Sequence, residues 1–208
     1  MPVVLLVRHG QASFGAADYD VLSEAGREQS AAVGRELARR QLRDPLLLCG
    51  TLRRQRDTAL LLGLGGEPEV DARWDEYDHL GLIERYPSGR QADVSSSQGM
   101  QVLLDDALAT WVADRDGTFP AFQGGAAGAL GELAGRGRDA VVVTSGGVVA
   151  ALADSLLGLG GAGVVGLNRV AANCSVTKVV VGRSGASLVS YNEHAHFEGP
   201  DRRLLTYR

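Results

Sequence analysis

The sequence has few of the residues that mark several protein classes. Only Cys49 and Cys174 are cysteines among 208 residues, and both lie within hydrophobic runs. This is too few for a disulfide framework or a cysteine-rich zinc site, so we expect buried, reduced thiols. No hydrophobic run approaches the roughly 20 residues that a membrane-spanning helix needs. The short aliphatic run after Met1 lacks the basic start and the length of a signal peptide, so we expect a cytoplasmic protein.

The sequence also lacks a strong excess of charge of either sign. Its formal net charge is -4 at pH 7, which provides no overall field to attract nucleic acid or an anionic membrane. We therefore expect no nucleic acid and no membrane as a partner, and any anion must be bound by a local group of arginines. With 45% hydrophobic and 22% charged residues, the composition is typical of a folded globular protein.

Three short aliphatic runs are the strongest structural signals in the chain. They cover residues 3–7, 46–49 and 140–143, and each is continuous, as in strands that helices cover on both faces. A helical pattern follows each run. This alternation predicts an α/β fold, a three-layer α/β/α sandwich with a mostly parallel central sheet. The length of the chain favours one domain over residues 1–208.

Smaller signals complete the predicted order of elements. Ser23 can cap a helix that begins beside it and ends near Arg40. Residues 175–181 and 186–191 alternate in polarity around a glycine-containing turn, which predicts a hairpin. Residues 82–101 are polar and show no periodicity, so we expect a surface excursion there, followed by a helix over 100–114. The glycine-rich segment 122–137 predicts a helix that is irregular or depends on tertiary packing.

The three predicted buried strands end in the motifs RHG, GTLRRQRDT and TSGG. Because ligands bind beyond the carboxyl ends of parallel strands, we expect these motifs to meet at one crevice. The motifs supply guanidinium groups, one imidazole and two amides at a helix start, from Arg8, His9, one or more of Arg53, Arg54 and Arg56, Gly146 and Gly147. Guanidinium groups and helix N-termini both suit phosphate oxygens. The crevice is therefore predicted to bind a phosphoryl group.

His9 is the candidate nucleophile at this crevice. Neighbouring arginines disfavour the imidazolium form and lower the pKa, which keeps a lone pair available near neutral pH. Attack of that lone pair on phosphorus would form a phosphohistidine. This chemistry needs no metal or other cofactor. His194 and His196, which alternate near the end of the chain, are interpreted as solvated or hydrogen-bonded side chains rather than metal ligands.

Three segments resemble the histidine phosphatase superfamily, also called the phosphoglycerate mutase-like family. They are LVRHGQAS, YDVLSEAGREQS and GTLRRQRDTA, and the resemblance extends over nearly the whole chain. It implies that His9 accepts the phosphoryl group and that Arg8 and Arg54 bind the phosphoryl oxygens. It also implies that Glu76, in WDEYDH, is the general acid and then the general base, with its neighbours Asp75 and Asp78 as competitors for that role.

Ser145 departs from the family pattern, because it stands where the family carries a second histidine. A serine can donate a hydrogen bond to the phosphoryl group but brings no positive charge, so we expect weakened activity. The predicted function is hydrolysis of a small phosphorylated metabolite, with residues 82–120 as a cap or insertion over the pocket. Three alternatives stay open: a noncatalytic phosphate-ester sensor, phosphoglycerate mutase-type phosphoryl transfer, and a phosphatase of phosphorylated proteins.

Overall fold

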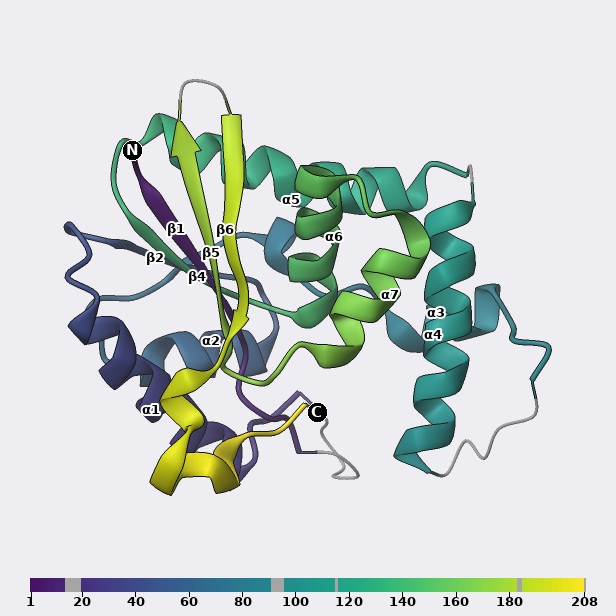
Figure 1. Ribbon diagram of the computed structural model, residues 1–208, viewed down its shortest axis with the longest axis horizontal. Coiled ribbons are helices and arrows are strands. Elements are labelled where there is room, and N and C mark those ends of the chain that lie inside the picture. The colour runs from purple at the N-terminus through teal and green to yellow at the C-terminus, as the bar shows by residue number, and fades with distance from the viewer. Residues whose placement is uncertain (14–19, 91–95, 115, 183–184, 208) are drawn as a thin grey trace.

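A six-stranded sheet lies between helices on its two faces (Figure 1). The computed structural model describes residues 1–13, 20–90, 96–114, 116–182 and 185–207. The strands are β1 (Val3–Arg8), β2 (Leu46–Cys49), β3 (Glu69–Val70), β4 (Ala140–Thr144), β5 (Val176–Gly182) and β6 (Gly185–Glu193). The helices are α1 (Glu24–Arg39), α2 (Arg53–Leu61), α3 (His79–Arg85), α4 (Ser97–Ala113), α5 (Thr118–Gly135), α6 (Gly146–Leu157) and α7 (Gly160–Val170). Short 3-10 helices cover Ala72–Trp74, Ala195–Phe197 and Gly199–Leu204.

The sheet has the strand order β3-β2-β4-β1-β5-β6. The first four strands in this order are parallel to one another, whereas β5 pairs antiparallel with both β1 and β6. The three continuous aliphatic runs are the adjacent strands β2, β4 and β1, and the predicted hairpin is β5 with β6. The α/β fold with a mostly parallel central sheet is therefore confirmed.

Alternate residues of the central strands build two separate cores. Val4 and Leu6 of β1 face the side where α5 and α6 pack, and they share a buried cluster with Leu130 and Val148. Leu5 belongs to the opposite cluster, formed with α1 and α2. Burial on both faces explains why these strands are continuously apolar in the sequence. On the side of α1, the helix begins as predicted, because the Ser23 hydroxyl accepts a hydrogen bond from the Gly26 amide at 3.0 Å.

The carboxyl ends of β1, β4 and β2 lie side by side. Arg8 at the end of β1 is in register with Thr144 at the end of β4, and the His9 amide continues the ladder by donating to the Thr144 carbonyl at 2.9 Å. The Gly50 amide after β2 donates to the Val143 carbonyl at 3.3 Å. The three motifs that the sequence placed at one crevice are thus neighbours at one edge of the sheet.

A group of helices beyond α6 differs from the sequence-based expectation. Residues 82–85 belong to α3 and α4 begins at Ser97, so residues 82–101 are partly helical, although residues 91–95 lie outside the described part of the chain. Both helices have an N-cap side chain, Asp78 for α3 and Ser96 for α4. A third apolar cluster joins α3, α4 and α7. Burial in this cluster stabilises the helices, and the short, polar sequence of residues 82–101 does not reveal it.

The glycine-rich segment forms a regular helix. Helix α5 runs for 18 residues over Thr118–Gly135 without a break, and its buried residues Ala126, Ala129, Leu130 and Leu133 pack against the sheet. Tertiary packing therefore offsets the low helix propensity of its glycines. No helix in the described ranges has both the length and the apolar composition to cross a bilayer.

Candidate functional site

The segment that follows β1 places His9 beside α1 and α2. At Gly10 the backbone approaches α1 so closely that a Cβ would lie 2.4 Å from the Gly26 carbonyl oxygen, which only glycine tolerates. The Gly10 amide donates to the Thr58 hydroxyl of α2 at 3.0 Å. These contacts fix the backbone that carries His9 and so fix the direction of its imidazole.

The imidazole of His9 is held with its Nε2 lone pair toward α2. The Nδ1 atom lies 2.8 Å from the Gly10 carbonyl oxygen, so Nδ1 carries the proton and donates. The Nε2 atom accepts a hydrogen bond from Arg54 Nε at 3.1 Å. Burial, then the charges of Arg54 and Arg8, lowers the pKa of His9 well below its ordinary value. The side chain is therefore a neutral imidazole near neutral pH.

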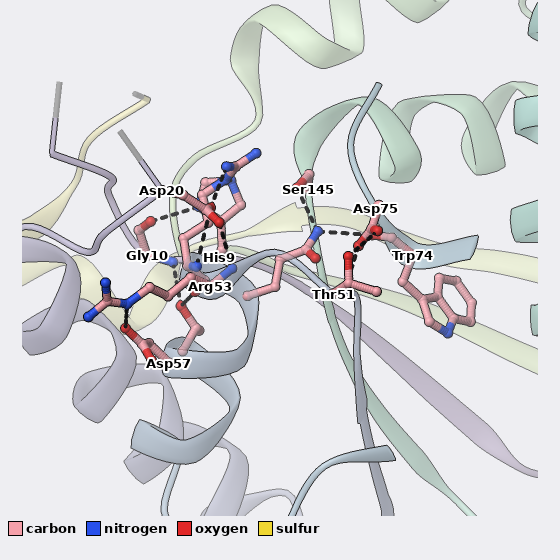
Figure 2. A network of polar contacts seen from close by, with 12 residues as sticks. His9, Gly10, Asp20, Thr51, Arg53, Asp57, Trp74, Asp75 and Ser145 are labelled. Carbon is pink, nitrogen blue, oxygen red and sulfur yellow. Dashed lines mark hydrogen bonds and ion pairs between the residues drawn. The ribbon is translucent and has the colours of Figure 1, made fainter. Parts of the chain in front are cut away.

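Arg54 is the buried arginine of the second motif. It lies in the first turn of α2, is 9% exposed, and forms an ion pair with Asp20 at 2.6 Å (Figure 2). Asp20 also accepts a hydrogen bond from the Arg53 amide at 2.7 Å, so one carboxylate orients the guanidinium and caps the start of the helix. The side chains of Arg53 and Arg56 are exposed on other faces of α2. The structure thus brings Arg54, and not its arginine neighbours, to His9.

Arg8 reaches the same place from the end of β1. Its Nη1 donates to the carbonyls of Ala171 and of Tyr207, the latter at 2.9 Å. The segment containing Tyr207 is itself attached to the strand end, because the Thr206 carbonyl accepts from the Asn173 amide at 2.8 Å. Arg8 is therefore positioned by backbone carbonyls, and its guanidinium lines the same cavity as His9.

Glu76 meets the start of α6. Its Oε2 accepts from the Gly147 amide at 3.1 Å and its Oε1 accepts from the Tyr77 amide at 3.3 Å. Burial raises the pKa of Glu76, although these hydrogen bonds and the charges of Arg54 and Arg8 oppose the shift. The raised pKa favours a carboxyl group that can hold a proton and release it to a leaving group.

The two neighbouring aspartates have other contacts. Asp75 accepts from the Thr51 amide and hydroxyl, both at 2.5 Å (Figure 2). Asp78 caps α3 by accepting from the Leu80 and Gly81 amides. Among these three acids of the WDEYDH segment, Glu76 is the one that lines the cavity beside His9.

Ser145 lies deeper than the other predicted site residues. It is fully buried, and its hydroxyl accepts a hydrogen bond from Gln55 Nε2 at 2.9 Å (Figure 2). The same nitrogen donates to the Trp74 carbonyl at 2.9 Å. Among the described residues, Ser145 is not part of the cavity lining. Sequence reasoning missed Gln55, because a glutamine beside Arg54 gives no periodic or motif signal of its own.

Four of the predicted site residues line one cavity of about 280 Å³, namely Arg8, His9, Arg54 and Glu76. Its lining comprises Arg8, His9, Ala12, Arg54, Glu76, Tyr77, His79, Leu80, Met100, Gln101, Leu104, Asn168, Arg169 and Tyr207. This volume suits a small molecule rather than a polymer. Sequence reasoning expected residues 82–120, which include α4, to lie over the pocket, but it did not identify the contribution of α7, because the two helices meet only through tertiary packing. The interpretation of residues 82–120 as a cap or insertion stays a prediction.

The described residues offer no evident metal site. No group of three or more His, Cys, Asp or Glu side chains there could hold a metal ion. His194 Nδ1 lies 2.6 Å from the Asn192 carbonyl oxygen, and His196 Nε2 lies 3.0 Å from the Cys174 carbonyl oxygen. The cavity lining itself provides the imidazoles of His9 and His79, the carboxyl group of Glu76 and three guanidinium groups, those of Arg8, Arg54 and Arg169.

Comparisons with known proteins give a consistent picture. Residues 4–194 match the histidine phosphatase superfamily (branch 1). The glucosyl-3-phosphoglycerate phosphatase of Mycolicibacterium vanbaalenii is 33% identical over 178 residues, which are 75% of this chain and 74% of the relative. A solved mycobacterial glucosyl-3-phosphoglycerate phosphatase in complex with VO3 is 26% identical with a TM-score of 0.52, covering 93% of this chain and 100% of that chain. The phosphoserine phosphatase of Entamoeba histolytica, solved with phosphoserine, shares the fold at 16% identity, with a TM-score of 0.68 over 94% and 99% of the two chains.

Proposed function

This chain belongs to the histidine phosphatase superfamily, and from that premise we propose that it hydrolyses the phosphate monoester of a small metabolite through a phosphohistidine. The observation that carries the proposal is the contact of 3.1 Å between His9 Nε2 and Arg54 Nε in a cavity that Glu76 also lines. The relatives named above are phosphatases, which supports the same reaction class. The free, buried cysteines Cys49 and Cys174 support a reducing, cytoplasmic location as part of this proposal.

In the first step, the neutral His9 attacks the phosphorus of the ester. A bond forms between Nε2 and phosphorus while the bond from phosphorus to the ester oxygen breaks, and Glu76 gives its proton to the departing oxygen. Arg8 and Arg54 stabilise the charge on the phosphoryl oxygens during the transfer. The Nδ1 hydrogen bond to the Gly10 carbonyl stabilises the positive charge that develops on the ring.

In the second step, water replaces the alcohol. The Glu76 carboxylate takes a proton from the water, whose oxygen forms a bond to phosphorus. The bond between phosphorus and Nε2 breaks, and its electron pair returns to the imidazole. Inorganic phosphate leaves, and both His9 and Glu76 regain their initial protonation states, so the cycle needs no other reactant.

Ser145 bears on the rate of the proposed hydrolysis and on the alternative of a protein that binds phosphate esters without turnover. Its hydroxyl acts as an acceptor toward Gln55, so its own proton is free to be donated, but the side chain is fully buried outside the cavity lining. A missing donor to the transition state lowers the rate by about 10²- to 10³-fold. This placement of Ser145 favours, as a second candidate, a protein that binds phosphate esters without turnover.

The test is transfer of a radiolabelled phosphoryl group from a panel of small esters, together with measurement of phosphate release. We expect a label on the wild-type protein that is labile in acid and stable in base, and its loss in His9→Ala. His194→Ala is a matched control, because this histidine contacts the Asn192 carbonyl outside the cavity, and it should retain the label. A label that persists in His9→Ala would contradict the mechanism. Binding of esters without His9-dependent release would favour the second candidate.

A further inference from the structure

A buried glutamine of α2 joins three segments of the site and has no task in the mechanism above. Gln55 directly follows Arg54 in the sequence and is fully buried. Its Nε2 donates to the Trp74 carbonyl and to the Ser145 hydroxyl, both at 2.9 Å (Figure 2). One side chain thus connects α2 with the segment that carries Glu76 and with the N-cap residue of α6.

These two hydrogen bonds lie on either side of the contact that holds the proposed acid. Trp74 comes two residues before Glu76, and Ser145 comes two residues before Gly147. The Gly147 amide donates to Glu76 Oε2 at 3.1 Å. The amide of Gln55 therefore closes a ring of contacts, and each of its bonds fixes the backbone beside one partner of the contact between Glu76 and Gly147.

The same turn of α2 also holds the proposed nucleophile. Arg54 Nε donates to His9 Nε2 at 3.1 Å, and Gln55 is the next residue of that helix. Adjacent residues of one helix thus contact the nucleophile and the two segments that position the acid. Catalytic groups must be held by such supporting contacts, because a misplacement of about 1 Å can lower a rate by 10²-fold.

Stability of the fold alone does not explain a glutamine at this position. The Trp74 carbonyl can only accept, so it determines that the nitrogen of the amide faces it. Gln55 Oε1 is then buried, and it has no hydrogen-bond partner among the described residues, which is unfavourable for folding. The Trp74 carbonyl also accepts from the Thr144 hydroxyl at 2.7 Å, so it would keep a donor beside an apolar side chain. These contacts favour a functional reason for the amide.

We propose that Gln55 is a positioning residue that holds the Glu76 carboxyl in place relative to His9. This inference rests on the proposed function, and it adds a group that acts through Glu76, because Gln55 is not among the described residues that line the cavity. Loss of the amide should let the segments that it joins shift relative to α2. Protonation of the leaving group should then weaken, while the arginines that bind the phosphoryl group stay in place.

The test variant is Gln55→Met, which keeps the length of the side chain and removes the amide. We compare kcat/KM because it reports the steps up to departure of the alcohol. It should fall by about 10- to 100-fold for an alkyl phosphate. It should fall by less than about 3-fold for p-nitrophenyl phosphate, whose leaving group needs little protonation. An equal loss on both esters would overturn the inference.

Gln29→Met is the matched control. Gln29 is also fully buried, and its Nε2 also donates twice, to the Leu204 carbonyl and the Thr206 hydroxyl, both at 2.7 Å. The substitution removes a buried amide that does not contact the segments beside Glu76, so any loss should be the same factor for both esters. A loss confined to the alkyl ester in Gln29→Met would show that the effect is not particular to Gln55.

A double-mutant cycle tests whether Gln55 acts through Glu76. In a Glu76→Gln background, Gln55→Met should lower kcat/KM for the alkyl ester by less than about 3-fold, because no acid is left to position. A full loss in that background would overturn the inference. Thermal melting shows whether each variant is folded. Gln55→Asn, whose amide is one methylene too short for both contacts, takes the same tests if Gln55→Met melts below the assay temperature.

NMR of the Gly147 amide distinguishes this inference from the proposed function. Because this amide donates to Glu76, its resonance should shift as the carboxyl group titrates, and Gln55→Met should lose most of that shift. Hydrolysis that depends on His9 but not on Gln55 would overturn the inference alone. If no ester is hydrolysed, the proposed function fails and the titration still decides: an unchanged shift in Gln55→Met overturns the positioning role, and its loss supports that role.

Discussion

At the scale of single residues, burial shifts the pKa values of His9 and Glu76 in opposite directions. It lowers that of His9 and raises that of Glu76, because burial disfavours the charged form of each group. Both shifts serve the proposed reaction, which needs a neutral imidazole and a protonated carboxyl at the same pH. A buried imidazole with a lowered pKa beside a buried carboxyl group with a raised pKa is the pattern expected of a nucleophile and a general acid.

These shifts predict the dependence of activity on pH. For an alkyl phosphate, activity should persist well below pH 6.5, the ordinary value of His9, because protonation of the imidazole is delayed to lower pH. Activity should fall as pH rises through the pKa of Glu76, which lies above its ordinary value of 4.5. We therefore expect a bell-shaped profile of kcat/KM with its maximum on the acid side of neutrality, measured by phosphate release across pH.

Substitution of Glu76 isolates the alkaline limb of that profile. Glu76→Gln should lower kcat for an alkyl phosphate by about 10²- to 10⁴-fold and remove the alkaline limb. The loss should be far smaller for p-nitrophenyl phosphate, whose leaving group needs little protonation. Asp75→Asn makes the same change of carboxylate to amide at the next residue and should keep the limb. An alkaline limb that vanishes in Asp75→Asn instead would assign the acid to Asp75.

Single residues also show how far the sequence could predict the site. Arg8 and His9 were predictable because they come directly after a strongly apolar run at a fixed edge of the sheet. The pattern alone left Arg53, Arg54 and Arg56 open, and the family resemblance singled out Arg54. Gln55 was not, because its contact with Ser145 joins two chain segments far apart in sequence. Partners of this kind depend on tertiary geometry that no local pattern contains.

At the scale of secondary-structure elements, strands and helices also differ in how well the sequence predicts them. Strands β1, β2 and β4 were predicted within one residue, since burial on both faces leaves an unbroken aliphatic run in the sequence. Helices α3 and α4 were harder, because their apolar residues pack on one another and on α7 rather than on the sheet. Helix α4 was still predicted, over 100–114 against the observed Ser97–Ala113, whereas α3 was not predicted. The regularity of the glycine-rich α5 depends on its packing against the sheet.

The first turn of α6 yields a prediction about how elements fit together. At Gly147 a Cβ would lie 2.2 Å from Glu76 Oε1 and 2.3 Å from Tyr77 Cε1. Gly147→Ala should therefore displace the Glu76 carboxyl and lower kcat for alkyl phosphates by about 10²-fold or more. Steady-state kinetics on alkyl and p-nitrophenyl esters measures the effect, which should be smaller for the activated ester.

Gly166→Ala is the matched control for that substitution. Gly166 lies in α7, and a Cβ there meets no atom within 4 Å. Alanine in the interior of a helix is more favourable than glycine by about 0.5 to 1 kcal/mol, so this variant should fold and turn over normally. Equal activity of Gly147→Ala and Gly166→Ala would show that the position of Glu76 does not depend on the start of α6.

The whole molecule brings anion-binding groups from separate elements to one cavity, so an anion should stabilise the entire fold. Inorganic phosphate at 100 times its Kd would add about 2.7 kcal/mol to the free energy of unfolding, which corresponds to a rise in Tm of about 5 to 11 °C for a domain of this size. Arg54→Ala should abolish the rise, whereas Arg53→Ala, at an exposed neighbour, should keep it. Calorimetric melting with and without phosphate measures both, and an equal rise in all three proteins would place the anion elsewhere.

At the same scale, the architecture was largely predictable and the substrate end of the cavity was not. Continuous strands followed by helices are sufficient to predict a mostly parallel sheet, and such a sheet places its strand ends together. The wall of α4 and α7 depends on how an outer group of helices packs against α6, as the third apolar cluster shows. The predicted phosphoryl-binding residues Arg8 and Arg54 thus lie on the common framework, whereas α4 and α7 form the opposite wall of the cavity.

The hydrogen bond from Arg54 Nε to His9 Nε2 implies that, without substrate, the proposed nucleophilic atom of His9 is occupied by the guanidinium. The electron pair that must attack phosphorus is already engaged by the guanidinium, and it is released only when Arg54 finds a better acceptor. A phosphoryl oxygen is such an acceptor, whereas an uncharged electrophile is not. A phosphate ester would therefore free the Nε2 lone pair of His9 as it binds to Arg54. A reagent without an anionic oxygen would leave that lone pair in its hydrogen bond and should react with His9 more slowly.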